Sequence, residues 1–197
     1  MESIVTAQEV IQFTKRNRIP GYMLKLDFEK AYDMADWECI IESLQASGFC
    51  PKWLLWIKLW LSFARVSLLI IGSLGWNIAC KRGLTLGDPL SPLIFVLAAN
   101  GLYFMVKSCQ KKGLLKGMGC RDETNAIINL HYADDTLIFG EECVVQAVIL
   151  KCILYCFEEW SGLRINFHKS ALSYQGTTRS AVSLYHKFLA VQLKGCL

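Results

Sequence analysis

The amino-acid sequence predicts an α+β fold, with an antiparallel sheet and helices packed on one face of it. Short apolar runs of strand length are interspersed with amphipathic segments of helix length. Strict alternation of strand and helix is absent, which favours antiparallel pairs over a parallel sheet. Hydrophobic residues make up 53% of the 197 residues and charged residues 19%. We therefore expect one ordered domain with a large core over residues 1–197.

The first half of the chain predicts helices, a strand and a hairpin, each with local start or stop signals. Pro20 and Gly21 end the first helical pattern. Asp36 is a good N-cap for the second, and Gly48 is a good C-terminal stop. The third is apolar nearly all round, which predicts a buried helix. The expected elements are helices over Ser3–Lys15, after Asp36 and over Pro51–Ser62, a strand over Tyr22–Phe28, and a hairpin from Val66–Ile71 and Trp76–Cys80 around Gly72–Gly75.

The second half predicts a long helix, another hairpin, a further helix and a strand. Asp88 is a natural N-cap and Pro89 a natural first helical residue. Gly162 ends the last helical pattern. The expected elements are a helix from Pro89 to about Lys107, strands over Asn125–Tyr132 and Thr136–Phe139, a helix over Glu142–Trp160, and a strand over Leu163–Phe167.

Charge, cysteine content and hydropathy exclude some classes of protein. The net charge of +4 is too small to indicate nucleic acid by itself. Nine cysteines occur without a C-x-x-C pair, so we expect reduced, mostly buried thiols of an intracellular protein, with Cys152 and Cys156 in the core. Trp53–Leu61 is too short to span a membrane, and polar residues interrupt Leu90–Val106. Both are expected to be buried core helices, so no membrane partner is predicted.

Acidic residues at the ends of two expected strands are the main functional signal. Asp134 and Asp135 lie side by side at the tip of the second hairpin, and Asp27 lies at the end of the first strand. Adjacent carboxylates repel unless a cation lies between them. Divalent ions such as Mg²⁺ prefer oxygen ligands, and two such ions can promote nucleotidyl transfer. The alternative is an ordinary turn, since aspartate is common in turns.

Four segments in order resemble the reverse transcriptase domain of non-LTR (LINE-type) retrotransposons, particularly those of plants. The resemblance covers the chain from about Glu2 to its end. Its segments are Leu24–Asp33, Arg82–Leu84 with Gly87–Pro92, Tyr132–Asp135, and Ser161–Asn166 with Lys169-Ser170. A single segment is weak evidence, whereas the ordered set is specific.

The resemblance implies a right-hand polymerase palm that carries out RNA-templated DNA synthesis. Asp27, Asp134 and Asp135 would be the catalytic acids. They would also be metal ligands, with Asp27 and Asp134 the firmer pair and the Phe28 carbonyl a further ligand. The implied cofactor is Mg²⁺, with Mn²⁺ as an alternative. The implied partners are an RNA template, a DNA primer and deoxynucleoside triphosphates.

The same resemblance assigns residues to the nucleotide and template. Tyr32 would pack against the sugar and disfavour a 2′-hydroxyl, which is compatible with core packing. Lys169 would lie near the pyrophosphate, although a surface lysine explains it nearly as well. Those that would shape the loop and the helix start beneath the template and nucleotide are Gly83, Gly87, Pro89 and Ser91.

Two features set limits on the expected activity. Thr85 and Leu86 replace the arginine and glutamine that the family usually has in the second segment. Most of the fingers, the thumb and any endonuclease region are expected to lie outside the chain, in a parent polyprotein. An inactive transposon-derived remnant with weak nucleic-acid binding is therefore the alternative function. A membrane-associated or interaction protein is a third hypothesis, without basic flanking residues to support it.

Overall fold

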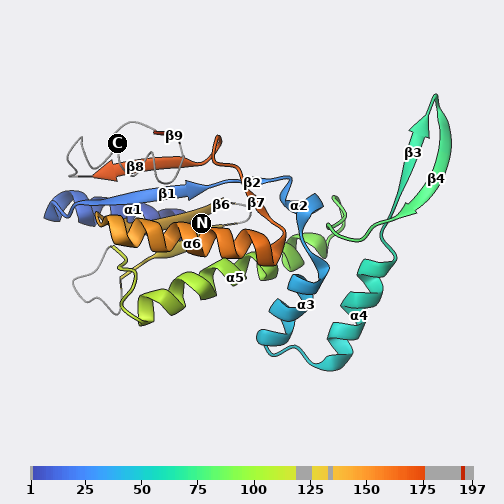
Figure 1. The fold of residues 1–197 in the computed structure, drawn as a ribbon, viewed down its shortest axis with the longest axis horizontal. Coiled ribbons are helices and arrows are strands. Elements are labelled where there is room, and N and C mark those ends of the chain that lie inside the picture. The colour runs from blue at the N-terminus through green and yellow to red at the C-terminus, as the bar shows by residue number, and fades with distance from the viewer. Residues whose placement is uncertain (1, 119–125, 133–134, 176–191, 194–197) are drawn as a thin grey trace.

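A computed structural model describes residues 2–118, 126–132, 135–175 and 192–193. The elements, in chain order, are α1 (Glu2–Asn17), β1 (Gly21–Leu26), β2 (Phe28–Glu29), α2 (Ala31–Met34), α3 (Trp37–Ala46), α4 (Pro51–Ser62), β3 (Arg65–Ile70), β4 (Ser73–Ala79), α5 (Ser91–Lys111), β5 (Asn129–Tyr132), β6 (Asp135–Glu141), α6 (Val144–Ser161), β7 (Arg164–Ile165), β8 (Ala171–Gln175) and β9 (Gln192–Leu193). The order confirms a mixed fold of helices and mainly antiparallel strands (Figure 1).

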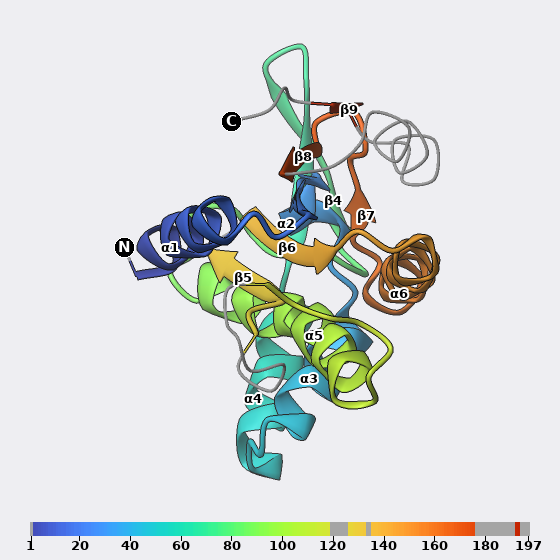
Figure 2. The same cartoon turned by 90° about the vertical axis from the view of Figure 1, so that its left-hand side faces the viewer.

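The central sheet has the strand order β5-β6-β1-β8-β9. Strand β1 pairs antiparallel with both β6 and β8, while β9 runs parallel to β8. Helices α5 and α6 lie together on one face of this sheet, as predicted (Figure 2). Helix α1 packs on the opposite face through Ala7 and Val10, against Phe139 of β6. Strand β8 had no sequence-based prediction, and it completes the pairing of β1.

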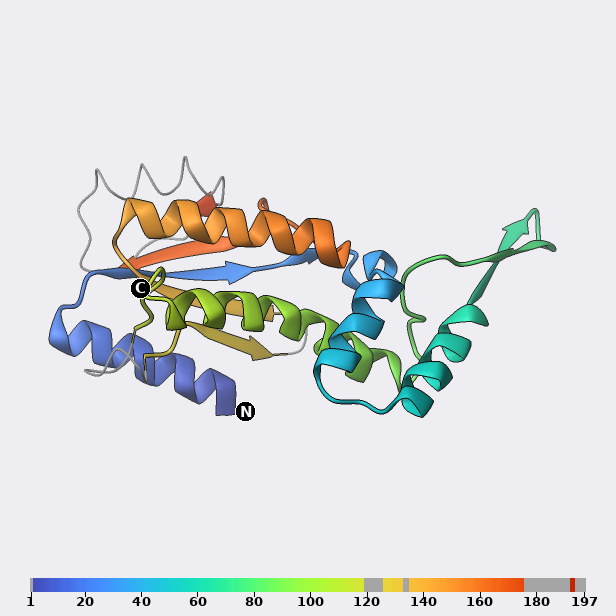
Figure 3. The ribbon, with the colours of Figure 1, turned by 60° about the horizontal axis from the view of Figure 1, so that its bottom comes forward.

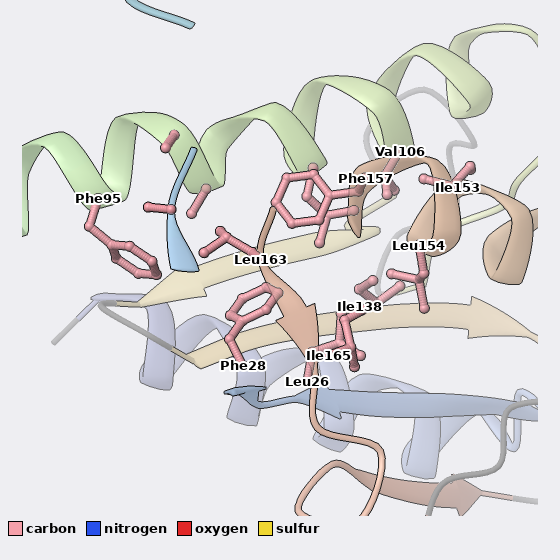
Figure 4. Packing of buried hydrophobic residues seen from close by; sticks show 14 of the residues in the cluster. Leu26, Phe28, Phe95, Val106, Ile138, Ile153, Leu154, Phe157, Leu163 and Ile165 are labelled. Carbon is pink, nitrogen blue, oxygen red and sulfur yellow. The ribbon is translucent and has the colours of Figure 1, made fainter. Parts of the chain in front are cut away.

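The main core lies between the sheet and helices α5 and α6. Leu26 of β1, Ile138 of β6 and Phe157 of α6 are almost wholly buried there, and Figure 4 shows them converging. Burying a side chain of this size contributes about 1.5–3 kcal/mol. Strand β1, which leads into Asp27, is therefore held by the main core.

Local signals explain several element boundaries. Oδ1 of Asp36 accepts hydrogen bonds from the backbone N–H groups of Glu38 (2.8 Å) and Cys39 (3.1 Å), which confirms the predicted N-cap. Gly162 has a φ of 71° and ends α6 in the left-handed conformation, as predicted. The first hairpin is also confirmed, but its turn comes earlier than expected. Ile70 pairs with Ser73, so only two residues, 71 and 72, form the loop.

Helix α4 and the β3–β4 hairpin form an arm that projects from this body (Figures 1 and 3). The prediction that α4 is buried all round is wrong: only Ile57 and Leu61 are buried, against α3 and its neighbours. Trp53 and Trp56 are each about half exposed, and every residue of β3 is exposed. An apolar sequence shows that a helix can be buried, but the elements that pack against it decide which of its side chains are buried.

The cysteine prediction also needs correction. Of the seven cysteines in the described part of the chain, only Cys39 is buried. Cys152 and Cys156 are exposed, because they lie on the face of α6 that points away from Phe157. The described cysteines are free thiols, as expected. Burial is the main reason that the pKa of Cys39 rises to about 12.

Helix α5 is long and apolar enough to cross a membrane, judged by length and composition alone. Core helices of soluble proteins pass the same test, so this is weak evidence for a span. Ile94, Phe95, Leu102 and Val106 of α5 are buried in the main core, in agreement with the predicted core helix.

Candidate active site

Asp27 and Asp135 come together at one end of the central sheet. Leu26 of β1 pairs with Thr136 of β6 in an antiparallel register. Continuing that register by one residue places Asp27 opposite Asp135. Residues 28–134 separate the two acids in the chain, and the pairing of β1 with β6 brings them to the same end of the sheet, as the sequence-based hypothesis requires. Asp134, the third predicted acid, lies outside the described residues.

Lys25 is a charged neighbour that the sequence-based reasoning missed. Its Nζ lies 2.8 Å from Oδ2 of Asp135, and the two side chains are 43% and 45% exposed. Side chains alternate between the faces of a strand, so Lys25 and Asp27 lie on the same face of the sheet. Lys25 precedes Asp27 by two residues, and this spacing was the sequence signal that both side chains lie on one face of the strand.

The fourth sequence segment fixes the backbone of Asp27. The N–H of Asp27 donates to Oγ of Ser170 (3.1 Å), and its carbonyl accepts from the N–H of Asn166 (2.8 Å). Next to it, Phe28 of β2 pairs with Ile165 of β7. Both polar backbone groups of Asp27 are therefore satisfied within the protein. This leaves its half-buried carboxylate as the group available for chemistry.

The second segment packs against the loop that follows the first. The N–H of Gly83 donates to the carbonyl of Ala35 (2.8 Å), and the N–H of Leu84 donates to that of Tyr32 (2.6 Å). Trp37 Nε1 donates to the Gly83 carbonyl (2.8 Å). Gly83 has a φ of 85°, and a Cβ there would lie 2.7 Å from the carbonyl oxygen of Asp33. Glycine is required at this point for two independent reasons.

The start of α5 is shaped by Asp88. Its Oδ1 accepts hydrogen bonds from the N–H groups of Leu90 (2.7 Å) and Ser91 (3.3 Å). Ser91 is wholly buried, so its side chain cannot touch a ligand in this conformation. Gly87, with a φ of 88°, and Pro89 are exposed in the preceding loop. Leu86, which replaces the usual glutamine, is 73% exposed.

The other predicted ligand-contacting residues lie around the same end of the sheet. Tyr32 is half buried and stacks on Phe95 of α5, with ring centroids 5.1 Å apart. The Phe28 ring is buried and lies 6.1 Å from that of Phe157, centroid to centroid. Lys169 is exposed in the turn before Ser170. The described residues of the first, third and fourth segments thus lie at the end of β1, and the second segment packs on Tyr32 of the first.

The donor set fits a hard divalent cation. Asp27 and Asp135 supply carboxylate oxygens from opposed strand ends, which is the ligand chemistry of Mg²⁺. Within the described ranges there is no group of three or more His, Cys, Asp and Glu residues that could hold a metal ion.

Sequence comparison identifies the family and a transposon relative. Residues 1–193 match the family described as reverse transcriptase (RNA-dependent DNA polymerase). The chain is 26% identical over 178 residues to an uncharacterized 149 kDa protein of transposon TX1 from Xenopus laevis. That match covers 90% of this chain but 13% of the relative. An uncharacterized mitochondrial protein of Arabidopsis thaliana is 40% identical over 56 residues, covering 28% of this chain and 46% of the relative.

The fold also matches that of solved telomerases. Apo telomerase from Candida tropicalis, truncated from its C-terminal domain, matches with a TM-score of 0.59 and 18% identity, over 91% of this chain and 36% of the telomerase chain. The same enzyme in complex with a fragment of telomeric RNA gives a TM-score of 0.57 and 15% identity, over 87% of this chain and 28% of that chain. The right-hand polymerase palm predicted from sequence is confirmed, and the chain belongs to the reverse transcriptase (RNA-dependent DNA polymerase) family.

Proposed function

We propose that this chain is the palm of an RNA-directed DNA polymerase. The observation that supports the proposal is the register of β1 and β6, which pairs Leu26 with Thr136, the residues next to Asp27 and Asp135. Backbone hydrogen bonds tie the fourth segment to Asp27, and they tie the second segment to Tyr32 and Ala35, which follow Asp27 in the chain. A site assembled from four distant parts of the chain is better explained by chemistry than by the turn preference of aspartate.

The acids would act by holding divalent metal ions. Asp27 and Asp134 are the proposed principal ligands, with Asp135 and the Phe28 carbonyl beside them. Bound Mg²⁺ would activate the primer hydroxyl and stabilise the departing pyrophosphate. The protein supplies position: the two hydrogen bonds to the Asp27 backbone keep its carboxylate at the sheet end.

The remaining residues would bind and orient the substrates, which are an RNA template, a DNA primer and deoxynucleoside triphosphates. Tyr32 is held by its stack on Phe95, so it presents a fixed surface to the sugar. Gly87 and Pro89 leave an exposed loop beneath the template, supported by the buried Ser91. Lys169 is exposed and free to approach the pyrophosphate.

Primer extension on an RNA template with Mg²⁺ tests the proposal. We expect the wild-type chain to incorporate nucleotides, and Asp27→Asn and Asp134→Asn each to reduce incorporation by at least about 100-fold. Glu38→Gln, on the exposed surface of α3, is the matched control and should retain full activity.

Two results would contradict this function. Incorporation that survives Asp134→Asn would exclude the proposed mechanism. No incorporation by the wild-type chain with either Mg²⁺ or Mn²⁺ would favour the inactive remnant. Leu86→Gln then restores the amide that the family has at this position. Activity regained in this variant would assign the loss to a template contact, and continued inactivity would assign it to the metal site.

A further inference from the structure

The ion pair between Lys25 and Asp135 lies inside the proposed metal site. Lys25 pairs with Leu137 across β1 and β6, so Asp135 is its diagonal neighbour on the same face of the sheet. Their 2.8 Å contact therefore follows from the register of the two strands. Asp27, two residues after Lys25, extends the same face. One cation and two carboxylates thus share the end of this face.

An ion pair with both partners nearly half exposed contributes little to stability. Its position has a larger consequence for the carboxylates. Asp27 and Asp135 carry two negative charges at the same sheet end, and such charges repel. The ammonium of Lys25 offsets one of them and engages one oxygen of Asp135. An oxygen that accepts this charged hydrogen bond is a poorer ligand for a second cation.

We propose that Lys25 is a positioning residue that holds the Asp135 carboxylate, so that Asp135 binds the divalent cation less strongly than Asp27 does. This inference rests on the proposed function. Lys25 acts through Asp135, and it lowers the affinity of the site for the divalent cation. Asp135 is held by Lys25 and therefore contributes less to metal binding than Asp27 does.

Two other roles for Lys25 make different predictions. If the ion pair only stabilises the fold, its loss lowers thermal stability and leaves metal affinity unchanged. If Lys25 contacts a phosphate of the nucleotide, its loss raises the KM for deoxynucleoside triphosphate at saturating metal. Metal affinity measured without nucleotide separates all three roles.

The test is Mn²⁺ titration of the nucleotide-free chain, with free Mn²⁺ measured by electron paramagnetic resonance. Lys25→Gln should bind Mn²⁺ roughly two- to fivefold more tightly, the range expected for a half-exposed pair. Lys25→Arg keeps the charge and the pair, so its affinity should stay near that of the wild type. Lys111→Gln, an exposed lysine at the C-terminal end of α5, controls for the change in net charge.

A double-mutant cycle shows whether Lys25 acts through Asp135. The effect of Lys25→Gln should shrink when Asp135→Asn is already present. Asp135→Asn alone should weaken Mn²⁺ binding less than Asp27→Asn does. The Mg²⁺ concentration for half-maximal primer extension should fall in Lys25→Gln, with the KM for nucleotide unchanged at saturating metal.

Several outcomes overturn the inference alone. They are wild-type Mn²⁺ affinity in Lys25→Gln, an equal effect of Lys25→Gln with and without Asp135, and a raised nucleotide KM without a change in metal affinity. Failure of the proposed function looks different. In that case the wild-type chain binds no Mn²⁺, or binds it equally well after Asp27→Asn, and both proposals fall together.

Discussion

The body of the molecule and its projecting arm are both rich in apolar residues, but these are buried in the body and exposed in the arm. In the body, Leu26, Ile138 and Phe157 are almost wholly buried (Figure 4). In the arm, Trp76 is 87% exposed and Ile71 is fully exposed. The body positions Asp27 and Asp135, so packing there fixes the proposed chemistry. The arm shows that apolar sequence alone does not build a core, because β3 and β4 pair only with each other.

Truncating one aromatic residue in each region tests the contrast with the largest expected effect. Phe157→Ala should lower the free energy of unfolding by about 3–5 kcal/mol, because it leaves a cavity beside Phe28 and Trp160. Trp76→Ala should change it by less than about 0.5 kcal/mol, because the side chain is already in water. Urea unfolding followed by circular dichroism measures both. Equal losses would show that the arm is packed as tightly as the body.

The loop that returns from the arm to the body gives a smaller and more local test. Gly83→Ala combines a φ of 85° with a 2.7 Å approach to the Asp33 carbonyl, so it should cost about 2–4 kcal/mol. Gly87→Ala has a similar φ of 88° but nothing within 4 Å, so it should cost about 1–2 kcal/mol. The same unfolding experiment compares them. A cost for Gly87→Ala as large as that for Gly83→Ala would mean that contact with the first segment is unimportant.

The smallest expected effect is a pH dependence of stability that the buried Cys39 should cause and the exposed Cys152 should not. The pKa of Cys39 is raised from 9.0 to about 12 by burial, so the folded state keeps the proton after the unfolded state loses it. Stability should therefore fall as pH rises from about 9 towards about 12. Unfolding at pH 8 and pH 10 should show a loss that Cys39→Ala removes and Cys152→Ala does not. A loss of the same size in Cys39→Ala would assign the pH dependence to other groups.

Short-range signals explain why much of the fold was predictable. The cap at Asp36, the stop at Gly162 and the bounds of α4 each depend on neighbours in the chain, and the structure confirms them. The exposure of α4 and of Cys152 was predicted wrongly. Both depend on which surface lies opposite, and a hydrophobic pattern does not contain that information. Strand β8 was missed because it has only five residues, and so short a run gives a weak alternation signal.

The candidate site divides in the same way. The sequence by itself identified the residues that we propose for the chemistry, since Asp27, Asp135 and the four segments are recognised by residue type and order. Only the tertiary structure decided which of them meet. Asp27 faces Asp135 because of the register of β1 and β6, and the same register brings Lys25 to Asp135. The spacing of Lys25 and Asp27 puts both on one face of β1, but strand register is set by long-range packing of both strands against the core, so only the folded structure brings the lysine to Asp135.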